Sequence, residues 1–171
     1  TFRSEYGGLQ ERYDAEPDLT AMGKLIGGGF PVGALAGRAQ VMDVMNPLAA
    51  RVLFPHSGTF SANPITMTAG LTAMALFDRP AISRLNSLTT QAIQGIEQAI
   101  RTTGIAACVT GAGSLFRVHL KPSPPMNYRD GFPTPRETRR LGLLLDDLFE
   151  SGFIMINTCS AALSTAAEES E

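Results

Sequence analysis

The sequence has no tryptophan and only two cysteines and two histidines among its 171 residues. Cys108 and Cys159 stand 51 positions apart, and His56 and His119 are equally isolated, so neither pair has the short spacing of metal ligands. This scarcity argues against a zinc site and against a disulfide framework. We expect no metal and two free thiols, which is typical of a protein of the reducing cytoplasm.

An excess of one charge and a long apolar run are also missing. The chain has 14 Lys and Arg against 16 Asp and Glu, a net charge of -2, and no basic run. A nucleic-acid or membrane surface is therefore not expected. No apolar stretch approaches the roughly 18 residues that a membrane-spanning helix needs. The composition favours a protein that acts on small molecules.

Glycine, in contrast, is concentrated around one lysine. Lys24 is followed by Gly27, Gly28 and Gly29. Glycines in a row mark a tight turn or a close approach of the backbone to something else, such as a cofactor. The order is not that of a phosphate-binding GxxxxGK[ST] loop, because these glycines follow the lysine. Two interpretations fit: a solvated lysine of a turn, or an amine used chemically, for example as a Schiff base with an aldehyde.

The first half of the chain predicts an α/β arrangement. Residues 1–18 are polar and rich in turn formers, and predict a connector. The small and apolar residues 32–37 predict a strand buried on both faces, and residues 38–45 a short helix. Asn63 before Pro64 predicts a helix start, because asparagine caps free amides and proline suits the first helical position. The expected apolar side of that helix consists of Ile65, Leu71, Met74 and Phe77.

The second half predicts a compact α+β unit. Residues 80–104 have apolar side chains at steps of three and four, which predicts a long helix ended by Gly104. Residues 114–120 alternate and predict a half-exposed strand with Arg117 and His119 on its polar face. Residues 122–133 predict a proline-rich loop. The pattern from Thr134 to Glu137 predicts a capping box that opens a leucine-striped helix, and FIMI, from Phe153, predicts a strand.

Two motifs occur in a specific order. They are PDLTAMGKLIGGGFPVGALAGR at residues 17–38 and HSGTFSANPITMTAG at residues 56–70. This sequence resembles the class III aminotransferases, pyridoxal-phosphate enzymes of fold type I, and within them the branch that contains glutamate-1-semialdehyde 2,1-aminomutase. The similarity continues more weakly to LSTAAEESE at residues 163–171. It covers nearly the whole chain, which corresponds to the C-terminal part of such an enzyme.

The resemblance implies the fold, the domains and the cofactor. The fold would be α/β, with residues 1–79 as the end of the large pyridoxal-phosphate domain and residues 80–171 as an incomplete small C-terminal α+β domain. Lys24 would hold pyridoxal 5'-phosphate as a Schiff base and carry the proton. The aspartate that pairs with the pyridine nitrogen, and the main phosphate loop, would precede Thr1.

The second motif implies a contact across a dimer. By itself, Ser57-Gly58-Thr59 is a weak signal, because a hydroxyl and amides beside a glycine are common in loops as well as at phosphate sites. The resemblance implies that Gly58 and Thr59 bind the cofactor phosphate of a neighbouring subunit. Activity would then require a homodimer. His56 and His119 are expected to have no catalytic role.

Three functions are compatible with these motifs. The first is amino-group transfer from an amino acid to a keto acid or aldehyde. The second is the aminomutase reaction, which moves nitrogen within one molecule and gives 5-aminolevulinate for tetrapyrrole synthesis. The third is a non-catalytic scaffold, or a fragment inactive by itself because upstream residues are missing. HSGTFSANP departs from the GTLSGNP-like form of the aminomutase, which favours general transamination.

Overall fold

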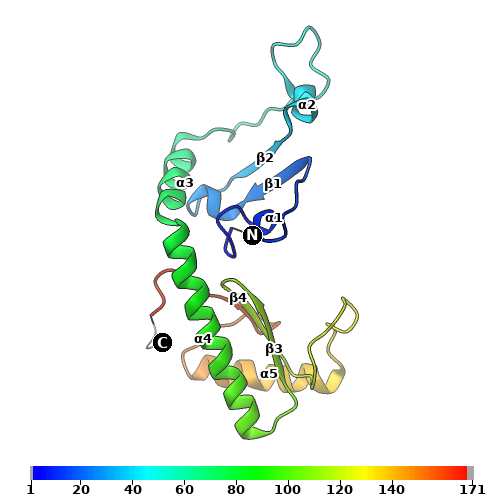
Figure 1. Ribbon diagram of the computed structural model, residues 1–171, viewed down its shortest axis with the longest axis vertical. Helices are drawn as coiled ribbons and strands as arrows, with labels where there is room; N and C mark the ends of the chain where they lie inside the picture. The colour runs from blue at the N-terminus through cyan, green and yellow to red at the C-terminus, as the bar shows by residue number, and fades with distance from the viewer. Residues whose placement is uncertain (1, 169–171) are drawn as a thin grey trace. The chain divides into compact units, whose positions relative to one another are not determined.

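The computed structural model describes residues 2–168, which divide into two compact units that meet between Arg79 and Pro80. Figure 1 shows the helices and strands of both units. The assignment of the two units to the large and small domains of a longer enzyme stays a prediction. Among residues 2–168, no helix combines the length and the apolar character needed to cross a membrane.

Two antiparallel strands form the sheet of the first unit (Figure 1). β1 (Leu19–Gly23) pairs with β2 (Gly33–Gly37) in a register that joins Leu19 to Gly37. The sequence predicted β2 but not β1. The predicted burial of β2 on both faces is wrong, since all five of its residues are exposed. Such burial needs a layer on each face, and residues 2–168 do not supply these layers.

A short helical segment and a long loop lead from β2 to α3. α2 (Ala39–Met42) and the 3-10 helix η2 (Asp43–Met45) confirm the predicted short helix, and α3 spans Pro64–Leu76. Asn63 Oδ1 accepts hydrogen bonds from the amides of Ile65 and Thr66 at 3.1 and 3.2 Å, which confirms the predicted cap.

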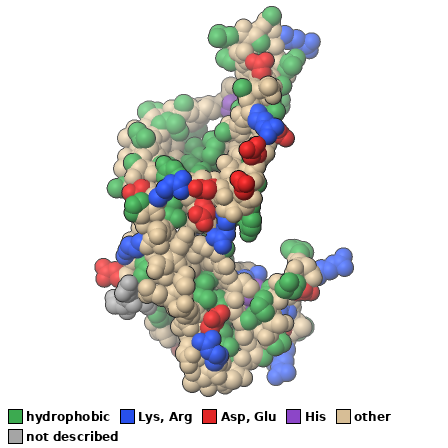
Figure 2. All heavy atoms as spheres, in the orientation of Figure 1, with side chains coloured by type: hydrophobic (Ala, Val, Ile, Leu, Met, Phe, Trp, Pro, Cys, Tyr) green, Lys and Arg blue, Asp and Glu red, His purple; other side chains and the backbone are tan. Residues whose placement is uncertain are grey.

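The predicted apolar side of α3 is not the side that is buried. Ile65 and Leu71 are 62% and 75% exposed, whereas Thr66 and Gly70 are buried. Green apolar side chains accordingly lie at the surface over α3 in Figure 2. α3 therefore packs through its small residues, Thr66 and Gly70.

The second unit is built around a long helix and three strands. α4 (Arg79–Thr103) begins at the last residue of the first unit, buries Ile82, Leu85 and Leu88, and ends as predicted at Gly104, whose φ is 66°. β3 (Cys108–Ala112), β4 (Leu115–His119) and β5 (Ser160–Ala162) form an antiparallel sheet in that order. β4 confirms the predicted strand but not its exposed polar face, because His119 is buried. β3 and β5 were missed.

α5 (Pro135–Glu150) follows the loop that the prolines predicted. The capping box is present: the Thr134 amide donates to Glu137 Oε2 at 2.6 Å, and the Glu137 amide donates to Thr134 Oγ1 at 3.3 Å. After α4, α5 is the second long helix of this unit. Residues next to α5 in sequence set both of its ends, as predicted. Thr134 caps its start, and the helix stops before Gly152, whose φ is 93°.

The predicted strand at FIMI is wrong. Residues 153–156 are irregular, and Ile154 is 85% exposed. β3 and β5 pair with the two edges of β4, and among the described residues no strand pairs with residues 153–156. The C-terminal segment is instead held by Arg84 of α4, which donates to the carbonyl oxygens of Thr165 and Ala167 at 3.0 and 2.9 Å. Residues 169–171 of the weakly similar LSTAAEESE lie outside the described residues.

Candidate active site

Lys24 lies where the first strand ends. It is the first residue of the 3-10 helix η1 (Lys24–Gly27), directly after β1, and its φ of 57° lies in the left-handed region that favours glycine. Its side chain is exposed and lines a hollow of about 310 Å³. Phe2, residues 7–10 and residues 20–23 form the rest of the wall.

The glycines after Lys24 make the turn compact. A Cβ on Gly27 would lie 2.5 Å from Val32 Cγ1, and a Cβ on Gly28 only 2.3 Å from the carbonyl oxygen of Ala69 in α3. Gly28 also has a φ of 58°. The close approach that the glycine cluster predicted is therefore made to Val32, just before β2, and to α3, and none of these glycines lines the hollow.

A glycine of α3 completes this fit from the other side. A Cβ on Gly70 would lie 2.1 Å from the carbonyl oxygen of Ile26 in η1. Two backbones can approach this closely only where a side chain is absent. The small face of α3 thereby fixes the turn that carries Lys24, which explains why Thr66 and Gly70 are buried and the larger apolar residues of α3 are not.

Two uncharged polar residues join the opposite walls of the hollow. Thr20 Oγ1 in β1 donates to Gln10 Oε1 at 3.0 Å. Gln10 belongs to α1 (Leu9–Arg12), a single helical turn within the predicted connector. Sequence reasoning missed both residues. The one signal in the sequence was the glycine pair before Leu9. Two glycines indicate that the chain turns there, but they do not indicate that the next residues will contact β1.

Gly58 and Thr59 lie in the exposed loop between η2 and α3. Within residues 2–168, the amides of residues 57–59 donate no hydrogen bond, and neither Gly58 nor Thr59 lines the hollow beside Lys24. The carbonyl oxygen of Gly58 accepts from the Ser61 amide at 2.9 Å, which shapes the turn. The structure thus brings Lys24 to a hollow and leaves residues 57–59 with unused donors at the surface.

The remaining candidates are structural. His119 is 6% exposed, and its Nε2 lies 2.8 Å from Thr110 Oγ1 on the neighbouring strand. Burial, with a smaller contribution from Arg117 and Lys121, lowers the pKa of His119. Cys108 and Cys159 are free thiols whose pKa values are raised by burial. Among residues 2–168, no three His, Cys, Asp or Glu side chains gather as a metal site would require.

Comparison with known proteins places the chain in a family. Residues 9–165 match the family described as aminotransferase class-III. The chain belongs to the class III aminotransferases. This family match confirms the resemblance carried by the two sequence motifs. The branch within the family stays a prediction.

Solved structures of class III aminotransferases and related enzymes share the fold. An omega-transaminase from Sphaerobacter thermophilus is 44% identical over 96% of this chain, with a TM-score of 0.93. A transaminase with PLP bound is 32% identical over 99% of it, with a TM-score of 0.86. The glutamate-1-semialdehyde aminomutase from Pseudomonas aeruginosa is 20% identical over 99%, with a TM-score of 0.81, and shows the fold alone.

The chain covers only part of each of these proteins. It spans 37%, 38% and 39% of the three chains, respectively. The expected fold class, a mixed α/β arrangement of the pyridoxal-phosphate-dependent aminotransferase type, is confirmed. The activity of the whole protein is therefore proposed, and the proposal rests on the residues of this chain that line the hollow beside Lys24.

Proposed function

We propose that this class III aminotransferase transfers amino groups with pyridoxal 5'-phosphate, and that Lys24 holds the cofactor covalently as a Schiff base. The observation that carries the proposal is the placement of Lys24. Lys24 lines a hollow of about 310 Å³ and comes directly after a strand, in a chain that belongs to a family of aminotransferases. This volume lies in the range of small-molecule sites, roughly 300–1,000 Å³.

The lining of the hollow fits an aldehyde cofactor held by one amine. Among the described residues that line it, Lys24 alone carries a titratable side chain. Lys24 is therefore both the amine that would condense with an aldehyde and the group that would move a proton. Pyridoxal phosphate, when bound, supplies an electron sink for carbanion charge. Lys24 Nζ, once released, would carry the proton at the substrate α-carbon.

We propose further that Gly58 and Thr59 bind the cofactor phosphate of a second subunit in a homodimer. The free amides of residues 57–59 and the Thr59 hydroxyl are suitable donors for phosphate oxygens. Their exposure and their absence from the wall of the hollow beside Lys24 support a role in another copy of the chain. In this proposal residues 1–79 belong to the large domain and residues 80–171 to the small one.

The proposed reaction is transfer between two molecules. The identity of 44% with an omega-transaminase supports this choice over the aminomutase reaction, because the aminomutase likeness is limited to the fold at 20% identity. The sequence HSGTFSANP, which departs from the aminomutase-like form, supports the same choice. The acceptor class would be a keto acid or an aldehyde.

Borohydride reduction of the full-length protein tests the cofactor. Reduction fixes an imine irreversibly, so mass spectrometry of a digest should find a phosphopyridoxyl group on the peptide that contains Lys24. A Lys24→Ala variant should lose the adduct, and a Lys121→Ala variant should keep it, because Lys121 lies in the second unit and is paired with Glu137 at 3.0 Å. An unmodified Lys24 peptide in the parent protein would contradict the proposal and favour a non-catalytic scaffold.

A substrate experiment separates the two enzyme classes. The full-length protein is given glutamate 1-semialdehyde without any keto acid, and in parallel an amino donor with a keto acid. Transfer only in the second reaction supports the proposed transaminase. Production of 5-aminolevulinate in the first reaction would show that the aminomutase assignment is the right one.

A further inference from the structure

We propose that Glu11 is a positioning residue for the hollow beside Lys24, because it fixes the turn that forms the wall opposite the lysine. The effect of Glu11 on catalysis rests on the proposed function, whereas its role in holding the wall does not. The structural part concerns the first unit alone and is testable without cofactor. Glu11 itself does not line the hollow, whereas the four residues before it do.

The wall opposite Lys24 has little stability of its own. It consists of residues 7–10, and its only regular element is α1, one helical turn of four residues. The residue before α1, Gly8, provides no side-chain cap. Isolated helices of this length do not form in water, because nucleation fixes several residues for a single hydrogen bond. The placement of this wall therefore depends on side-chain contacts.

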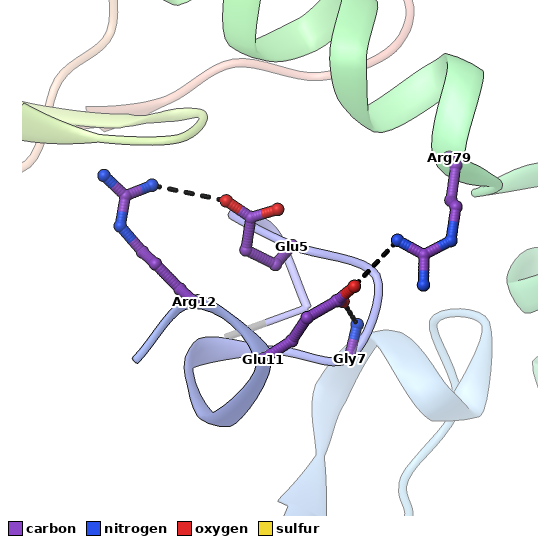
Figure 3. Close-up of polar contacts among 5 residues, drawn as sticks. All are labelled: Glu5, Gly7, Glu11, Arg12 and Arg79. Carbon is purple, nitrogen blue, oxygen red and sulfur yellow. Dashed lines mark hydrogen bonds and ion pairs between the residues drawn. The ribbon is translucent and has the colours of Figure 1, made fainter. Parts of the chain in front are cut away.

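Glu11 supplies two such contacts, one with each carboxylate oxygen (Figure 3). Oε2 accepts from the Gly7 amide at 2.5 Å, and Oε1 accepts from Arg79 Nη1 at 2.8 Å. A side chain on Gly7 would prevent the first bond, since a Cβ there would lie 2.9 Å from Oε2. The carboxylate thus ties the beginning of the turn to its own helix and to a residue 68 positions away.

Arg79 is in turn held from a second side. Its guanidinium carbon lies 4.9 Å from the centroid of the Tyr6 ring, a cation–π arrangement. The hydrogen bond from Arg79 is the largest cause that lowers the pKa of Glu11, followed by the bond from the Gly7 amide. Glu11 is therefore a carboxylate at neutral pH, and both of its contacts are charge-assisted.

The neighbouring side chain, Gln10, anchors the same turn to β1 through its bond from Thr20 at 3.0 Å. Two consecutive residues of α1 therefore link the wall to two different places: Gln10 to the strand that ends at Lys24, and Glu11 to the first residue of α4. Loss of the Glu11 link would remove the connection to Arg79 and leave the connection from Gln10 to β1 in place. The width of the hollow would then vary while the position of Lys24 stays fixed by α3.

The chain contains a matched control for this effect. Glu5 also pairs with an arginine near α1, since Arg12 Nη1 lies 3.4 Å from Glu5 Oε1 (Figure 3). Among the described residues, the side chain of Glu5 forms no hydrogen bond with the Gly7 amide or with Arg79, and its charge is the smallest of the influences that raise the pKa of Arg79. Glu5→Gln and Glu11→Gln therefore remove the same charge from the same segment, and only the second removes the hydrogen bonds that hold the wall. Exposed ion pairs contribute little to global stability, so both variants are expected to fold.

Hydrogen exchange of the full-length protein tests the structural part. Amides of residues 7–10 should exchange at least several-fold faster in Glu11→Gln and in Arg79→Gln than in the parent, and at the parent rate in Glu5→Gln. The double variant Glu11→Gln/Arg79→Gln should resemble Glu11→Gln, because the contact that Arg79→Gln removes is one that Glu11→Gln already weakens. Equal exchange in the parent and Glu11→Gln, or equal acceleration in Glu5→Gln, would overturn the inference.

Kinetics then test the positioning role. Glu11→Gln should raise the KM for the amino donor about tenfold and change kcat less than threefold, while borohydride still labels Lys24. A fall in kcat with unchanged KM would overturn the positioning role. If the parent protein itself shows no labelled Lys24, the proposed function fails, and the exchange result still decides whether Glu11 holds the wall.

Discussion

Replacement of Gly70 by alanine tests the packing that holds Lys24 in place. A Cβ at position 70 would lie 2.1 Å from the carbonyl oxygen of Ile26, whereas carbon and oxygen atoms in close contact are about 3.3 Å apart or more. The turn η1 and α3 must therefore separate by roughly 1.2 Å. Both partners are backbone or Cβ atoms of regular elements, so neither can rotate away as a flexible side chain would.

The expected magnitude follows from two opposing effects. Overpacking of this kind costs about 1–3 kcal/mol. Alanine in a helix interior is better than glycine by roughly 0.5–1 kcal/mol. The midpoints of these two ranges leave a net loss of roughly 1 kcal/mol in the free energy of unfolding of Gly70→Ala, read from urea denaturation followed by circular dichroism.

Gly95 provides the matched control. It also lies inside a long helix, and nothing would contact a Cβ there within 4 Å. Gly95→Ala should therefore stabilise the protein by about 0.5–1 kcal/mol, opposite in sign to Gly70→Ala. If Gly70→Ala is as stable as the parent while Gly95→Ala is stabilised as expected, the close packing of η1 on α3 does not contribute to the free energy of unfolding.

The same substitution has a catalytic readout. Lys24 lies two residues before Ile26, so a displacement of η1 by about 1 Å moves the amine by a similar distance, and a misplacement of that size can cost about 100-fold in rate. We expect Gly70→Ala to lower the turnover of the full-length enzyme by this order, with Gly95→Ala at the parent level. Unchanged turnover in a destabilised Gly70→Ala protein would separate the packing argument from the proposed function.

Three further predictions concern buried or capping groups. Thr66 is 2% exposed, and its hydroxyl has no hydrogen-bond partner among the described residues. Thr66→Val should therefore raise the urea midpoint and increase the free energy of unfolding by about 1 kcal/mol. The same change at the exposed Thr68 should leave the free energy of unfolding within about 0.5 kcal/mol of the parent value. Because burial lowers the pKa of His119 in the folded state, stability is complete above the unfolded value of about 6.5 and decreases as the pH falls toward the folded pKa; His119→Gln should remove this acid-side decrease when urea midpoints at pH 7.5 and at about 5.5 are compared. Thr134→Ala removes the hydroxyl that accepts a hydrogen bond from the Glu137 amide and should cost about 1 kcal/mol in the same assay; no change would mean that the cap does not stabilise α5.

Features with a local cause were predictable from the sequence. Asn63 and Thr134 cap helices through residues two or three positions away, and Gly104 ends α4 through its own backbone. The tight turn after Lys24 was predictable from the glycines beside it, whereas the backbone of α3 that this turn approaches was not. The two helix caps and the end of α4 depend on short stretches that contain their own partners.

Features with a distant partner were not predictable. FIMI has the composition of a strand, but residues 160–162, which the sequence did not predict as a strand, are the ones that pair with β4. The wall of the hollow is held by Gln10 and Glu11 through partners 10 and 68 positions away. Periodicity describes which face of an element is apolar, and says nothing about which part of the chain will meet that face.

The backbone at Lys24 has one more consequence, for the relation between fold and chemistry. A φ of 57° costs a residue with a Cβ roughly 1–2 kcal/mol relative to glycine, which adopts it freely. Judged by folding alone, position 24 should be another glycine in a glycine-rich turn. The chain instead has a lysine there. Under the proposed function, in which Lys24 holds the cofactor, the site and the stability of the turn are in conflict, and a more stable variant made by relieving that strain would be one that has lost its activity.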